Sequence, residues 1–206
     1  MIRAPWDGVA FSERADGDLR GDLPARARVS STLGIPPEWA EVRQVHGNQV
    51  VRVEMPGPSG EADALWTSEH QLPLAIFTAD CLGVVLAASD AVGIAHAGWR
   101  GTVGDVVGKL RDAMSRSGYA PERAAVGPGI GPCCFEVGTE VADQFPDQRA
   151  RTTWGTPSVD LPAAVGGALA GLDVWSTGAC TRHEEGWFSH RADATKQRLA
   201  ALGWLQ

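Results

Sequence analysis

The stretch LAIFTADCLGVVLAASDAVGIAHAGWRGTVGDVVGKLRDAMSRS, residues 74–117, decides the fold class. Its first half holds three apolar runs of strand length, Leu74–Thr78, Val84–Ala88 and Ala91–Ala95. In its second half, apolar residues recur at helical spacing, which predicts a helix over Thr102–Ser117. Strands and a helix within one short stretch indicate a domain that contains both.

The flanking sequence predicts further strands and helices without a regular alternation. Val42–Val45 and Val50–Val53 are β-branched runs that predict a hairpin with His46 at its turn. The remaining predicted strands are Arg123–Val126 and Asp173–Trp175, and the remaining predicted helices are Ala25–Leu33, Val137–Phe145, Leu161–Leu172 and Ala192–Leu202. No linker divides the chain, so we expect one compact α+β domain over residues 1–206, with mixed sheets flanked by helices.

Charge and hydropathy exclude several classes of partner. The net charge is −7, from 18 Lys and Arg against 25 Asp and Glu, which disfavours nucleic acid and anionic membrane surfaces. Apolar runs are too short to span a bilayer, and the first residues carry no stretch of signal-peptide length. We therefore expect a cytoplasmic protein that binds a small molecule.

Three residues stand where an apolar strand meets a turn, the usual position of functional side chains: His46, Cys81 and His96. Two imidazoles and one thiolate form a donor set that favours zinc and leaves one tetrahedral position open. The gaps between these residues match no short local zinc-ligand pattern, so their spacing alone leaves other interpretations open.

Two other interpretations apply to the same residues. A buried cysteine beside two hydrogen-bonded histidines would be purely structural. Alternatively, Cys81 is a nucleophile activated by His96, with Asp80 orienting the imidazole. Nearby, Arg100 precedes a predicted helix N-terminus, where phosphate or another anion can bind.

Seven strings follow one another in an order that is similar to the laccase-domain family, also called YfiH-type or polyphenol oxidase-like. The resemblance covers Val42 to the C-terminus, and its most specific string is His-Ala-Gly-Trp-Arg-Gly at residues 96–101. The strings are Gln44–Gly47, Ala62–Ala64, Thr78–Cys81, His96–Gly101, Gly127–Gly131, Cys180–Thr181 and Phe188–Arg191.

The resemblance implies a monomeric α+β domain with a zinc site formed by His46, Cys81 and His96. It further implies a purine nucleoside phosphorylase, acting on adenosine, inosine, guanosine or methylthioadenosine with phosphate, with adenosine deaminase activity. The activity classes are thus glycosyl transfer and hydrolysis. Cys81 and His96 would then act in catalysis, with Asp80 handling a proton or orienting a ligand.

Phosphate-binding candidates in this interpretation are Arg14, Arg100 and Arg191. Residues 1–41 are divergent and shortened relative to the family pattern, because Phe11–Arg14 is kept while the glycine pair that should follow is replaced. Two further hypotheses therefore stay open: a cysteine-type hydrolase or peptidoglycan-precursor editing factor that uses Cys81, and a nucleoside-binding protein without turnover. Copper is the less favoured metal, since three donors cannot build several copper centres.

Overall fold

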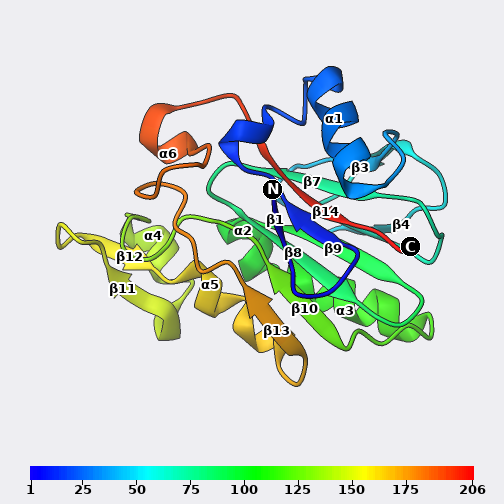
Figure 1. Ribbon diagram of the computed structural model, residues 1–206. Coiled ribbons are helices and arrows are strands. Elements are labelled where there is room, and N and C mark those ends of the chain that lie inside the picture. The colour runs from blue at the N-terminus through cyan, green and yellow to red at the C-terminus, as the bar shows by residue number, and fades with distance from the viewer.

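Two six-stranded sheets packed against each other form the centre of the computed structural model, which describes residues 1–206 (Figure 1). The first sheet has the order β1 (Ile2–Arg3), β2 (Val9–Phe11), β14 (Leu199–Gly203), β7 (Leu74–Thr78), β3 (Ala40–Arg43), β5 (Gly57–Glu61). The second has the order β13 (Asp173–Ser176), β10 (Arg123–Val126), β8 (Leu82–Ala87), β9 (Val92–Ala97), β6 (Ala64–Thr67), β4 (Val50–Arg52). Both sheets mix parallel and antiparallel pairs.

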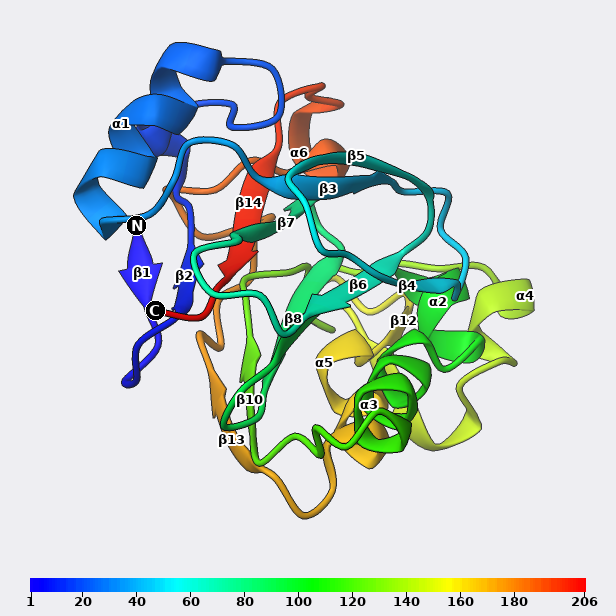
Figure 2. The same cartoon turned by 90° about the vertical axis from the view of Figure 1, so that its right-hand side faces the viewer.

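A long helix covers the outer face of each sheet, which makes four layers (Figures 1 and 2). Helix α1 (Leu23–Leu33) packs on the first sheet, and α3 (Val106–Arg116) packs on the second. The shorter elements are α2 (Trp99–Val103), α4 (Thr139–Ala142), α5 (Leu161–Ala164), α6 (His190–Asp193), the hairpin strands β11 (Arg149–Arg151) and β12 (Pro157–Val159), and 3-10 turns at Arg14–Asp16, Pro146–Gln148 and Gly166–Leu169.

Burial on both faces explains why the central strands are continuously apolar. In β7, Leu74 and Ile76 belong to the core between the sheets, whereas Ala75 and Phe77 pack toward α1. A strand that is covered on both sides needs no polar alternation. The sheets approach closely at Gly83, where an added Cβ would lie 2.5 Å from the Ala201 Cβ.

The predicted helix over Thr102–Ser117 is divided into α2 and α3. Asp105 adopts a left-handed conformation at φ 56° and caps α3 through a hydrogen bond from the Gly108 N–H. Beyond this break the predicted periodicity is confirmed, because Leu110 and Met114 are fully buried against the second sheet.

The predicted hairpin around His46 is wrong. Strand β3 lies in the first sheet and β4 in the second, so the intervening turn joins two layers instead of folding one strand back on the other. A β-branched run predicts that a segment forms a strand, but it does not indicate the strand with which that segment pairs.

The closing helix predicted over Ala192–Leu202 is also wrong. Its last part is β14, a central strand that pairs with β2 and β7 and is buried throughout. Long-range pairing outweighs the helix propensity of its Ala and Leu residues. The helices predicted at Val137–Phe145 and Leu161–Leu172 are shorter than expected, whereas the strands predicted at Leu74–Thr78 and Arg123–Val126 are confirmed. None of the helices has the length and apolar character that crossing a membrane requires.

Candidate metal centre

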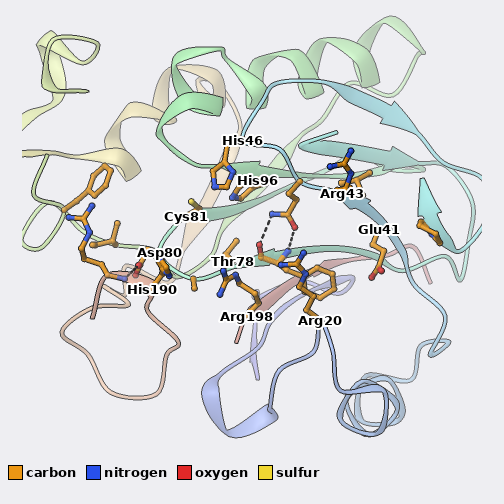
Figure 3. Close-up of a pocket in the computed structure, with 18 residues that line it drawn as sticks. Arg20, Glu41, Arg43, His46, Thr78, Asp80, Cys81, His96, His190 and Arg198 are labelled. Atoms are coloured by element: carbon orange, nitrogen blue, oxygen red, sulfur yellow. Dashed lines mark hydrogen bonds between the residues drawn. The ribbon is translucent and has the colours of Figure 1, made fainter. Parts of the chain in front are cut away.

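The three residues singled out in the sequence converge in space. His46 comes from the turn between the two sheets, Cys81 from the turn between β7 and β8, and His96 from within β9. One donor atom of each lies within 4.8 Å of the other two. Figure 3 shows them together at one wall of a pocket of about 530 Å³. This volume suits a small organic ligand.

Backbone geometry brings these donors together. His46 has a φ of 59°, in the left-handed region that few non-glycine residues adopt. Opposite them, Gly98 leaves necessary space, because a Cβ there would lie 3.0 Å from the Cys81 Sγ and 3.3 Å from the His46 Cδ2. The strained turn and the missing side chain both serve the arrangement of the donors.

Asp63 holds two of the three donors in place. Its fully buried carboxylate accepts a hydrogen bond from His96 Nδ1 at 2.8 Å, which leaves Nε2 as the free ring nitrogen of His96. The same carboxylate accepts the backbone N–H groups of His46 at 3.0 Å, Gly47 at 2.6 Å and Val45 at 3.2 Å. A carboxylate behind an imidazole is the usual support for a metal-binding histidine.

Electrostatics in this cluster favour the deprotonated thiol. Burial raises the pKa of Cys81, but hydrogen bonds with the His46 and His96 imidazoles outweigh it and lower the pKa to about 6. Burial lowers the pKa of His96, but Asp63 and the Cys81 thiolate raise it to about 9. Burial also raises the pKa of Asp63, yet its hydrogen bonds with His96, Gly47 and Val45 bring that pKa below the ordinary value.

Sequence reasoning did not assign a role to Asp63. The residue stands in the Ala62–Ala64 string, so the signal was present: an acid between two small residues immediately before a strand. Its partners are 16 to 33 positions away in the chain, which is why spacing alone does not reveal them.

Asp80 lies at the pocket wall, where its carboxylate is engaged by the C-terminal part of the chain. It accepts hydrogen bonds from the Thr181 and Ser189 hydroxyls and from the Arg191 backbone N–H, each at 2.7 Å. These contacts anchor the segment before α6. The expected part of Asp80 in proton handling stays a prediction.

Of the three predicted phosphate-binding arginines, Arg191 lines the pocket. Arg14 instead lines a separate cavity, where it stacks over Phe188 and lies 3.6 Å from an Asp193 carboxylate oxygen. Arg100 is exposed and stacks over the adjacent Trp99. The structure therefore brings only one of the three to the pocket.

Three other arginines line the pocket: Arg20, Arg43 and Arg198. Figure 3 shows Arg20 and Arg198 across the pocket from the histidines. Arg43 forms an ion pair with Glu61. Arg20 lies in the charged stretch of residues 14–22, whose composition predicts an irregular surface loop, and Arg198 lies in the predicted helix Ala192–Leu202. Neither was therefore predicted to bind phosphate.

A second group of side chains could also hold a metal: Cys133, Cys134, Cys180 and His183. It shares no residue with the first group and does not line the pocket.

Comparisons with known proteins agree with this fold and place the chain in a family. The family model described as multi-copper polyphenol oxidoreductase laccase matches residues 4–206. A purine nucleoside phosphorylase of Deinococcus radiodurans is 40% identical over 97% of this chain and 83% of that protein. The purine nucleoside phosphorylase ORF3 of Streptomyces griseus is 38% identical over 97% of this chain and 91% of that protein.

Two crystal structures show the same architecture. The hypothetical protein YfiH of Bacillus licheniformis superposes with a TM-score of 0.82 at 26% identity, over 91% of this chain and 82% of that one. YlmD of Geobacillus stearothermophilus superposes with a TM-score of 0.78 at 31% identity, over 92% of this chain and 82% of that one. Because the family model matches residues 4–206 and these relatives and solved structures cover more than nine-tenths of this chain, the chain belongs to the laccase-domain family.

Proposed function

We propose that this chain is a zinc-dependent purine nucleoside phosphorylase. The observation that supports this most is the convergence of His46, Cys81 and His96 at the wall of a pocket that also contains arginines. Relatives of similar length carry the name of the same activity. Because all of these pocket residues come from one chain, we propose that a monomer is sufficient.

The donor set fits zinc. One thiolate and two neutral imidazoles are typical of catalytic zinc sites, which keep a fourth position open. The Asp63 carboxylate supplies the support that such histidines need, and Gly98 leaves the space that the donors occupy. When bound there, zinc supplies positive charge and Lewis acidity at one wall of the pocket.

Phosphorolysis requires a bound phosphate, positioned against the anomeric carbon of the ribose. An oxygen of phosphate forms a bond to that carbon while the bond to the purine nitrogen breaks, and the purine leaves with the electron pair and takes up a proton. Arg20 and Arg198 present cations on the side of the pocket facing the histidines. We assign phosphate binding to these two, together with Arg191, since guanidinium groups match phosphate oxygens in geometry and charge.

Apolar side chains complete the pocket. Ile130 and Phe135 line it, with the Arg191 guanidinium packed over the Phe135 ring, and they offer a surface on which a purine ring can pack. Asp80 holds this wall by accepting the Arg191 backbone N–H. We therefore propose that Asp80 acts chiefly by positioning.

The direct test incubates zinc-loaded protein with inosine or adenosine, with and without phosphate, and separates the products by chromatography. We expect free base and ribose 1-phosphate only when phosphate is present. His46→Ala should abolish the reaction, whereas His70→Ala, which replaces an exposed histidine outside the site, should not. Nucleoside binding by zinc-loaded protein without base release would refute the proposed activity and favour a binding protein.

Deamination of adenosine is the second candidate activity at this centre, because three protein donors leave one tetrahedral position open. The adenosine arm of the same experiment reports it as inosine, formed independently of phosphate. A cysteine hydrolase is distinguished by alkylation: if Cys81 is a nucleophile and not a metal ligand, zinc will not slow its reaction with iodoacetamide.

A further inference from the structure

The second cluster joins three cysteines and one histidine that are far apart in the sequence. Cys133 and Cys134 follow the glycine-rich loop after β10, while Cys180 and His183 lie in the turn region after β13. The Cys133 Sγ is 3.5 Å from the Cys180 Sγ and 3.4 Å from the His183 Nδ1, and the Cys134 Sγ is 3.5 Å from that same nitrogen. The four donor atoms all lie within 4.8 Å of one another.

We propose that these four residues form a second, structural zinc site. Tetrahedral zinc with ordinary bond lengths separates two sulfur ligands by about 3.8 Å and a sulfur from a nitrogen by about 3.6 Å. Three of the six separations between donor atoms are 3.4 to 3.5 Å, slightly shorter than these values, and the other three are within 4.8 Å. Three cysteines and one histidine also form a complete donor set, so the site would have no open position for a substrate.

The surrounding backbone is adapted to this cluster. The Gly131 N–H donates to the Cys180 Sγ at 3.2 Å, a hydrogen bond that stabilises a thiolate. A Cβ at Gly131 would lie 3.3 Å from the Cys133 Sγ and 3.6 Å from the Cys180 Sγ, so a side chain there would crowd two donors. His183 is exposed, which gives an ion a path of entry from solvent.

The expected role of this zinc is to fix one wall of the pocket. It would tie the loop after β10 to the segment that follows β13, and these two already meet in a bridge between Gly129 and Cys180. The next residue, Thr181, donates to Asp80, and Ile130 of the same loop lines the pocket. The Gly129–Cys180 bridge and the Thr181–Asp80 hydrogen bond already hold this wall of the pocket. A metal bound to both segments would close the long stretch of chain between Cys134 and Cys180 and stabilise the wall further.

From the sequence alone, Cys133 and Cys134 are neighbours that are poorly placed to bond to each other, a pattern that favours a packing role. The structure shows instead that both sulfurs approach one histidine nitrogen. Because Cys133 also lies 3.5 Å from Cys180, a disulfide between these two is the competing state, and it would preclude the proposed site.

The test is zinc stoichiometry of protein purified under reducing conditions, measured by elemental mass spectrometry. Wild-type protein should carry two zinc ions per chain, and His183→Ala and His46→Ala one each. The double variant should carry none, while His70→Ala, a change at another exposed histidine, should keep two. Since His183 is on the surface, its replacement leaves the core intact.

Cobalt substitution provides a second measurement that does not depend on activity. The His46→Ala protein loaded with cobalt should keep intense thiolate-to-metal absorption from three cysteines, and His183→Ala should lose most of it. If wild-type zinc content is the same as that of His183→Ala, or if intact mass shows a Cys133–Cys180 disulfide in reduced, zinc-supplied protein, the second site does not exist. A wild-type content of one zinc that only His183→Ala removes would support this site and refute the proposed catalytic centre.

Discussion

Replacing Asp63 by Asn keeps the shape of the side chain and removes its charge, so it isolates what the carboxylate does. Oδ1 accepts from His96 and from the His46 N–H, and Oδ2 accepts from the Val45 and Gly47 N–H groups. An amide has one oxygen in place of two, and its NH₂ group would face donors. In either orientation, therefore, two of the four donors lose their acceptor.

The magnitude follows from these four hydrogen bonds. A buried donor without an acceptor costs about 1–3 kcal/mol; the His96 donor is buried and the three backbone N–H groups are partly buried, so we expect Asp63→Asn to lower the free energy of unfolding by about 2–6 kcal/mol, towards the lower end of that range. Loss of the carboxylate behind a metal-binding histidine weakens metal affinity about 10- to 100-fold. This corresponds to about 1.4–2.8 kcal/mol of binding free energy.

Both quantities are measured on the same protein. Urea unfolding gives the stability, and competition with a chromophoric chelator gives the zinc affinity of the His46–Cys81–His96 centre. Asp112→Asn is the matched control, because that exposed carboxylate makes only a surface ion pair with Arg116. Wild-type stability and zinc affinity in Asp63→Asn would show that the carboxylate does not organise the site.

Four further predictions follow from the same contacts. Gly98→Ala should weaken zinc binding in the chelator competition, since its Cβ would lie 3.0 Å from the Cys81 Sγ; Gly166→Ala, whose Cβ meets no atom within 4 Å, should not. Arg198→Ala should raise the KM for phosphate about 10- to 100-fold, because one charge-assisted hydrogen bond to phosphate is lost. An unchanged KM would show that Arg198 does not bind phosphate. In metal-free protein, the rate at which iodoacetamide alkylates Cys81 should have its midpoint near pH 6, because the lowered pKa of about 6 keeps the thiolate populated above that pH. Added zinc should suppress this alkylation. A midpoint near pH 8 to 9 would contradict the contacts between Cys81 and the two imidazoles. Leu110→Ala should lower the free energy of unfolding by about 2–5 kcal/mol in urea titrations, and a loss below 1 kcal/mol would mean that α3 is loosely packed.

The sequence was most informative where function and local structure coincide. The grouping of His46, Cys81 and His96 could be anticipated because each follows or ends an apolar run, the position at which a rigid scaffold often carries functional side chains, although His96 itself is buried within β9. The strand at Leu74–Thr78 was equally predictable, since a short apolar run rich in β-formers has few alternatives to a buried strand.

Other features depend on contacts between distant parts of the chain. The strand Leu199–Gly203 reads as helical on its own and becomes a strand only because β2 and β7 flank it. Arg20 lies in a charged segment without periodicity and Arg198 in a segment that reads as helical, so nothing local indicates that either side chain reaches the pocket. The cysteine cluster likewise depends on a separation of almost fifty residues between Cys133 and Cys180.

Anomalous diffraction at the zinc absorption edge, from crystals of the protein purified with zinc, is the most direct measurement of the centre. We expect a strong anomalous peak at bonding distance from the Cys81 Sγ, the His96 Nε2 and a ring nitrogen of His46, about 2.0 to 2.3 Å away. Density that shows these three side chains without an anomalous peak between them would contradict the proposed metal centre.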